Sequence, residues 1–254
     1  MNTLQAELSI LWPALIAGVL VVLSHVPLGQ QVLARGIVFI DLAIAQVAGV
    51  GVIAAHSFGL GATGWITQIA AAAAALAGAL LLTWTERKRP EVQEALIGIL
   101  FVLASTAQIL FLANDPHGGE DLKDLLAGQI LWVSPARLPW DALMYAAILA
   151  LWFGPVHRVG RIGFYALFAC AVTISVQLVG LYLVFATLVI PALATFYSRH
   201  RRLLKAYSLG AAAYLAGLLL STAADLPSGA MVVCTMAAFG LVFLLLTSRR
   251  ESRI

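Results

Sequence analysis

Two polar side chains interrupt an apolar stretch at residues 36–56, and both have oxygen atoms that could contact a cation. Asp41 lies six residues after Arg35. In a helix it would be about 9 Å from that end, and Gln46 about 16 Å, at ~1.5 Å per residue. The two positions are five apart, which separates them by about 140° around the helix axis. One cation shared by both side chains would therefore require a distorted helix.

Both residues also have ordinary structural interpretations. A charged group inside the bilayer costs at least ~2.5–3.5 kcal/mol on insertion scales, so Asp41 needs a partner or a function. It could bond to a neighbouring helix or extend to water, and Gln46 could form an interhelical hydrogen bond. Small residues surround both positions and allow other helices to approach this one closely; they are Ala43, Ala45, Ala48, Gly49, Gly51, Ala54 and Ala55.

Further candidate metal ligands lie at the far end of this stretch and beyond it. A neutral imidazole at His56 could receive a borderline cation, or it could be an ordinary histidine at the membrane surface. The segment 114–124 contains one histidine and four acidic residues. Among them, His117, Glu120 and Asp121 have ligand chemistry suited to zinc or manganese. The alternative is an acidic outer loop that attracts cations without binding them directly.

The composition identifies the kind of element that must position these residues. The 254 residues are 62% hydrophobic and only 11% charged, with a mean hydropathy of +0.97. Soluble domains carry about 25% charged residues, so this composition predicts an all-α, polytopic membrane protein. It excludes a soluble enzyme, a nucleic-acid-binding domain and a disordered chain. Cys170 and Cys234 lie in apolar runs, so neither a disulfide framework nor a cysteine metal site is indicated.

Eight or nine apolar runs are long enough to consider as crossings of a ~30 Å hydrocarbon core. They cover residues 9–25, 36–56, 65–84, 92–113, 139–154, 162–198, 207–223 and 229–247. His25 would end the first run. Glu94 would form an interfacial ion pair with the basic residues 87–89. Together the runs predict a single transmembrane domain over residues 1–254.

Most lysines and arginines fall at alternate ends of these runs, which indicates the cytoplasmic side. The run 162–198 has basic residues at both flanks, so it must go out and come back, turning near Gly180. Two crossings would give nine in total, with the N-terminus outside and the C-terminus in the cytoplasm. A broken or re-entrant pair of helices is the alternative. No Gly-x-x-x-x-Gly-Lys-Ser/Thr pattern occurs in the sequence, so this chain has no P-loop for ATP.

Four stretches resemble the membrane permeases of bacterial ATP-binding-cassette (ABC) transporters for zinc, manganese or iron(II). The first contains Pro27-Leu28-Gly29 and the segment from Arg35 to Asp41. The four stretches follow one another in the family's order, at residues 18–51, 98–134, 176–194 and 225–229. The family usually carries Asp-x-x-x-His on its second helix, whereas here Ala45 is the fourth residue after Asp41 and Gln46 follows. A second difference is the abbreviated basic loop 155–163, where the family has a coupling helix for the ATPase.

The resemblance implies a homodimeric permease in the bacterial inner membrane. Its expected partners are cytoplasmic ABC ATPase subunits and a periplasmic or lipid-anchored metal-binding protein. The expected cargo is a divalent metal, zinc first and manganese or iron(II) as alternatives, with no permanently bound cofactor. The competing hypotheses are a secondary carrier of small metabolites or ions, which works without an ATPase, and a membrane scaffold that transports nothing.

Overall fold

The computed structural model describes residues 3–57, 65–113, 119, 126–128, 130–154, 156–198 and 200–251; side chains 3–9, 56–57, 156–159 and 248–251 fall outside the description. Every regular element in these ranges is helical, which confirms the all-α prediction. The elements are α1 (Thr3–Arg35), α2 (Ile40–Ser57), α3 (Trp65–Lys88), η1 (Pro90–Val92), α4 (Gln93–Leu112), η2 (Ile130–Trp132), α6 (Leu138–Phe153), α7 (Val156–Val179), α8 (Leu181–Ala194), α9 (Arg202–Ala224) and α10 (Ser228–Glu251).

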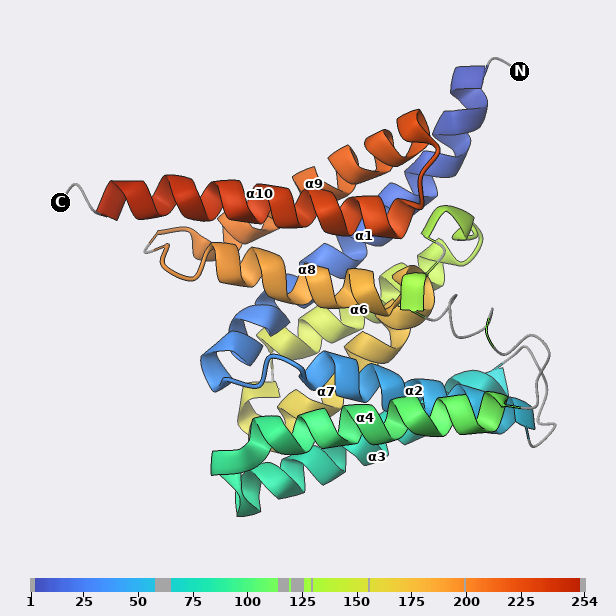
Figure 1. Ribbon diagram of the computed structural model, residues 1–254, viewed down its shortest axis with the longest axis vertical. Coiled ribbons are helices and arrows are strands. Elements are labelled where there is room, and N and C mark those ends of the chain that lie inside the picture. Colours follow the sequence, from blue (N-terminus) through green and yellow to red (C-terminus); the bar gives the residue numbers. More distant parts are fainter. Residues whose placement is uncertain are drawn as a thin grey trace. The chain divides into compact units, whose positions relative to one another are not determined.

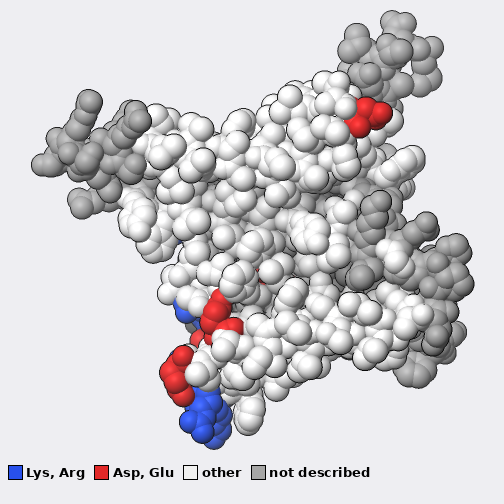
Figure 2. Space-filling model, viewed as in Figure 1, with Lys and Arg blue, Asp and Glu red and all other residues white. Residues whose placement is uncertain are grey.

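Six helices in the described part of the chain are long and apolar enough to cross a membrane. Three further apolar helices are shorter, namely Ile40–Ala55, Leu138–Phe153 and Leu181–Ala194. Charged side chains are sparse on the face drawn in Figure 2, and they gather where α3 ends and α4 begins. The number of crossings and the orientation of the termini stay predictions.

The chain divides into two compact units, each built from discontinuous segments. Unit 1 contains residues 1–35, 127–146 and 178–254, and unit 2 contains residues 36–126 and 147–177. In unit 1, α1 packs against α8 and α9, while α10 packs against α8 and α9 (Figure 1). In unit 2, α2 packs against both α3 and α4 (Figure 1).

Glycine and alanine bring the helices of unit 2 close together. A Cβ atom added at Gly51 would lie 2.6 Å from the carbonyl oxygen of Ala70, and one at Gly78 would lie 3.3 Å from Val47. Such distances leave little or no space for larger side chains. The small residues of α2 therefore let α3 approach to backbone contact.

The first helix is longer than the sequence predicts. We expected the run 9–25 to end at His25, but α1 continues through Pro27 to Arg35 and stops at Gly36, which has a φ of 70°. A proline inside a helix leaves the carbonyl four residues earlier without its N–H donor. That carbonyl belongs to Leu23, and the Tyr207 hydroxyl of α9 donates to it at 3.1 Å. Another helix thus replaces the missing hydrogen bond.

The break expected near Gly180 is present. Gly180, with a φ of 84° and a ψ of 159°, separates α7 from α8. The 14 residues of α8 span about 21 Å at ~1.5 Å per residue, which is less than the ~30 Å hydrocarbon core. Its length therefore fits the broken or re-entrant alternative better than a second full crossing.

Candidate functional site

Asp41 lies in the first turn of α2 and is completely buried, with 0% of its surface exposed. Neither carboxylate oxygen has a hydrogen-bond partner among the described residues. The side chain therefore neither extends to water nor bonds to a described neighbouring helix, which were the two structural alternatives. The partial positive charge at the N-terminus of α2 favours a carboxylate there, but only by about 0.3–1 kcal/mol. The structure thus contains a buried carboxyl group without a described hydrogen-bond partner at the start of α2.

Glu94 does not form the interfacial ion pair that we expected with residues 87–89. Its Oε1 accepts a hydrogen bond from the backbone N–H of Phe39 at 3.3 Å. Its Oε2 is buried and has no hydrogen-bond partner among the described residues. The ion-pair prediction was wrong because the first turn of α4 packs beside the start of α2, where the Phe39 N–H donates to Glu94. Nearness in sequence to residues 87–89 does not reveal this packing.

Gln46 is buried and forms hydrogen bonds with α4. This is the interhelical hydrogen bond that we gave as the alternative to a role in cation binding. The Nε2 of Gln108 donates to the Gln46 Oε1 at 2.6 Å and to the Gln46 backbone carbonyl at 2.8 Å. The Oε1 of Gln108 is left without a partner among the described residues. Sequence reasoning missed Gln108, although an amide in the apolar run 92–113 was a usable signal. No described contact joins Gln46 to Asp41.

Gly49 provides the space that Gln108 occupies. A Cβ atom at Gly49 would lie 2.8 Å from the Gln108 Nε2. We expect Gly49→Ala to displace this amide and lower the free energy of unfolding by about 1–2 kcal/mol. The measurement is thermal unfolding in detergent, followed by circular dichroism. The control is Gly98→Ala on α4, because a Cβ there meets nothing within 4 Å. Equal stability of the two variants would contradict the prediction.

The side chains of the remaining predicted metal ligands lie outside the description. His56 lies in the last turns of α2, but its side chain is not described. His117, Glu120 and Asp121 lie outside the described residues. Within the described part of the chain, no three histidine, cysteine, aspartate or glutamate residues gather in a metal-binding arrangement.

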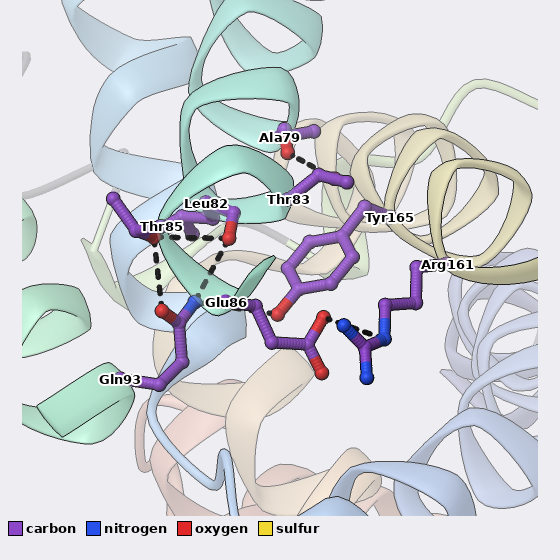
Figure 3. Close-up of polar contacts among 8 residues, drawn as sticks. All are labelled: Ala79, Leu82, Thr83, Thr85, Glu86, Gln93, Arg161 and Tyr165. Carbon is purple, nitrogen blue, oxygen red and sulfur yellow. Dashed lines mark hydrogen bonds and ion pairs between the residues drawn. The ribbon is translucent and has the colours of Figure 1, made fainter. Parts of the chain in front are cut away.

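A polar network that the sequence did not predict joins α3, α4 and α7 within unit 2 (Figure 3). Gln93 Nε2 donates to the Leu82 carbonyl at 3.0 Å and to the Tyr165 hydroxyl at 3.4 Å. The Thr85 hydroxyl donates to Gln93 Oε1 at 2.9 Å. Beside this network, Arg161 Nε lies 3.9 Å from Glu86 Oε2 (Figure 3). These contacts connect α3 and α4 to α7. The structure places residues 156–163, expected as a basic loop, in the first turns of α7.

Unit 1 contains an apolar cavity of about 610 Å³. Residues from three parts of the chain line it, including Gly128, Phe185 and Gly229. They belong to three of the four stretches that resemble the metal permeases. Gly128 and Gly180 touch through their backbones beside it, and a Cβ atom on either would overlap the other. The resembling stretches therefore meet in space within this unit.

Comparison with known proteins agrees with these observations. Residues 7–158 and 154–247 match the ABC 3 transport family, so the chain belongs to this family of metal-ion ABC permeases. The chain is 28% identical over 253 residues to an uncharacterized membrane protein of Synechocystis sp., covering 91% of this chain and 88% of that protein. The family resemblance seen in the sequence is thereby confirmed.

The fold is also similar to a solved structure, PsaBC from Streptococcus pneumoniae in complex with Fab. The alignment has a TM-score of 0.71 and 23% sequence identity, and it covers 92% of this chain and 90% of that chain. The chain is thus a helical membrane protein with the fold of this solved structure.

Proposed function

We propose that this chain is the permease subunit of an importer that carries a divalent cation across the bacterial inner membrane. Zinc is the first candidate cargo, and manganese and iron(II) are the alternatives. Membership of the ABC 3 transport family supports the class of transporter. The partners in this proposal are a second copy of the chain, cytoplasmic ABC ATPase subunits and an external metal-binding protein.

The buried carboxylate of Asp41 is the observation that most directly supports a cation as cargo. It has no described hydrogen-bond partner and no contact with water. A group of this kind is expensive in a membrane protein unless a positive charge compensates it during function. We propose that the cation contacts Asp41 in transit. A site with only a few ligands suits this role, because a complete tetrahedral site would retain zinc rather than release it.

The other predicted ligands have different parts in the proposal. Gln46 reaches the cation only when its amide oxygen leaves the Gln108 amide group. His56, His117, Glu120 and Asp121 serve the outer end of the pathway, where they attract the cation before it enters. Movement of the helices then follows ATP binding and hydrolysis by the partner subunits.

The test is reconstitution of the chain with its ATPase and binding protein in liposomes. Addition of the metal-loaded binding protein is expected to raise ATP turnover several-fold, and the metal that does so identifies the cargo. Liposomes with the ATPase but without this chain are the control. Cation or metabolite uptake by the chain alone, driven by an ion gradient and independent of ATP, would contradict the proposal and identify a secondary carrier.

A further inference from the structure

Two carboxylates, not one, lie together at the start of α2 and α4 in unit 2. Both residues are in the first turn of their helix, Asp41 in α2 and Glu94 in α4. The hydrogen bond from the Phe39 N–H to Glu94 Oε1 holds the first turn of α4 beside the start of α2. Asp41 and Glu94 are also close enough to interact electrostatically.

Three oxygen atoms at this place lack hydrogen-bond partners among the described residues. They are Oδ1 and Oδ2 of Asp41 and Oε2 of Glu94, and all three are buried. No ion pair joins either residue to a described lysine or arginine, although Arg87, Lys88 and Arg89 are near in sequence. Asp41 is fully buried and Glu94 is partly buried, and neighbouring carboxylates in such surroundings repel each other unless a proton or a cation lies between them. Since no described lysine or arginine pairs with either residue, a proton or a bound cation is what can offset this repulsion.

We infer that Glu94 is a second carboxylate ligand of the cation that contacts Asp41. The inference rests on the proposed function and extends it from one anionic ligand to two. Carboxylate oxygens bind divalent cations such as Mn²⁺ and also serve as ligands for Zn²⁺. Both residues lie next to basic segments, Arg35 before α2 and residues 87–89 before α4. By the positive-inside rule the pair is at the cytoplasmic end, where the cation leaves.

Glu94 also has a structural role, which the experiment must separate from metal binding. Its Oε1 accepts the Phe39 N–H, and an amide oxygen can accept the same hydrogen bond. Glu94→Gln therefore keeps the contact with α2 and removes only the charge. Glu91→Gln is the matched control, because Glu91 lies three residues earlier with 61% of its side chain exposed and pairs with Arg89 at 4.0 Å.

The probe is Mn²⁺ alone, titrated into the full-length chain in phosphatidylcholine nanodiscs. The electron paramagnetic resonance signal of free Mn²⁺ measures binding, and this lipid adds no anionic sites. We expect the dissociation constant to rise at least about ten-fold in Glu94→Gln and in Asp41→Asn. Glu91→Gln should bind like the original chain. Glu94→Asp, which restores the charge on a shorter side chain, should recover part of the affinity.

Two results would overturn the inference. Unchanged Mn²⁺ affinity in Glu94→Gln would show that Glu94 only caps α2, and an original chain that binds no Mn²⁺ would show that the pair is not a cation site. Thermal unfolding of each variant separates lost binding from lost folding. If Glu94→Gln binds normally while Asp41→Asn loses both binding and uptake, only this inference fails. If Asp41→Asn transports metal normally, the proposed contact between the cation and Asp41 fails as well, and if the original chain with its partners transports no metal, the proposed function fails.

Discussion

Replacement of Asp41 by asparagine is expected to reduce metal uptake by the assembled transporter at least about 100-fold, which corresponds to ~2.7 kcal/mol. Asparagine has nearly the same shape, so the packing at the start of α2 is kept. The change removes the negative charge that attracts the cation. It also removes the cost of burying that charge without a described partner, at least ~2.5–3.5 kcal/mol if it is ionised.

This combination separates a functional role from a structural one. We expect the unfolding temperature of Asp41→Asn to stay the same or rise while uptake of radioactive metal into liposomes is lost. A carboxylate that mainly stabilised the fold would give lower stability instead. Glu91→Gln, which alters an exposed acid before the first turn of α4, should leave uptake unchanged. Normal metal uptake by Asp41→Asn would remove this residue from the pathway.

The second large effect is expected at the break between α7 and α8. Gly180→Ala should lower the free energy of unfolding by about 4 kcal/mol, because two costs add. The backbone at φ 84° and ψ 159° is accessible almost only to glycine, which costs about 1–3 kcal/mol for another residue. The new methyl group would also overlap the backbone of Gly128, and such overpacking costs about 1–3 kcal/mol.

A glycine inside α7, the helix before this break, makes a suitable control for this measurement. Gly160 has a φ of 65°, but a Cβ atom there would meet nothing within 4 Å. Gly160→Ala therefore carries the conformational cost without the overlap and should destabilise the protein less than Gly180→Ala. Denaturation in detergent or the yield of folded protein after extraction would measure the difference. Equal losses in the two variants would mean that the contact with Gly128 contributes nothing.

Sequence alone predicted the features that depend on composition and local pattern. Few charges and long apolar runs gave the helical membrane class, and basic flanks on residues 162–198 located the break at Gly180. The four resembling stretches gave the family. The polar residue at position 41 was also recognisable, since a carboxylate in an apolar run is conspicuous without any structure.

Features that depend on distant partners could not be predicted in this way. The continuation of α1 through Pro27 requires Tyr207, which lies 180 residues later and supplies a donor to the Leu23 carbonyl. The contact between Glu94 and Phe39 and the amide pair of Gln46 and Gln108 each join residues more than 50 positions apart. In each case the packing of two helices selects the hydrogen-bond partner, and hydropathy carries no information about that choice.

The alanine and glycine surface of α2 has a mechanical consequence. Helices that interlock through long side chains must disengage those side chains before they can slide, and each such rearrangement adds a barrier. Where α2 meets α3 at Gly51 and Ala70, the contact is almost bare main chain. A small axial shift there requires few rotamer changes in the neighbouring helix. The contact with α3 therefore offers little side-chain resistance to a shift of α2, and such a shift would carry the Asp41 carboxylate with it.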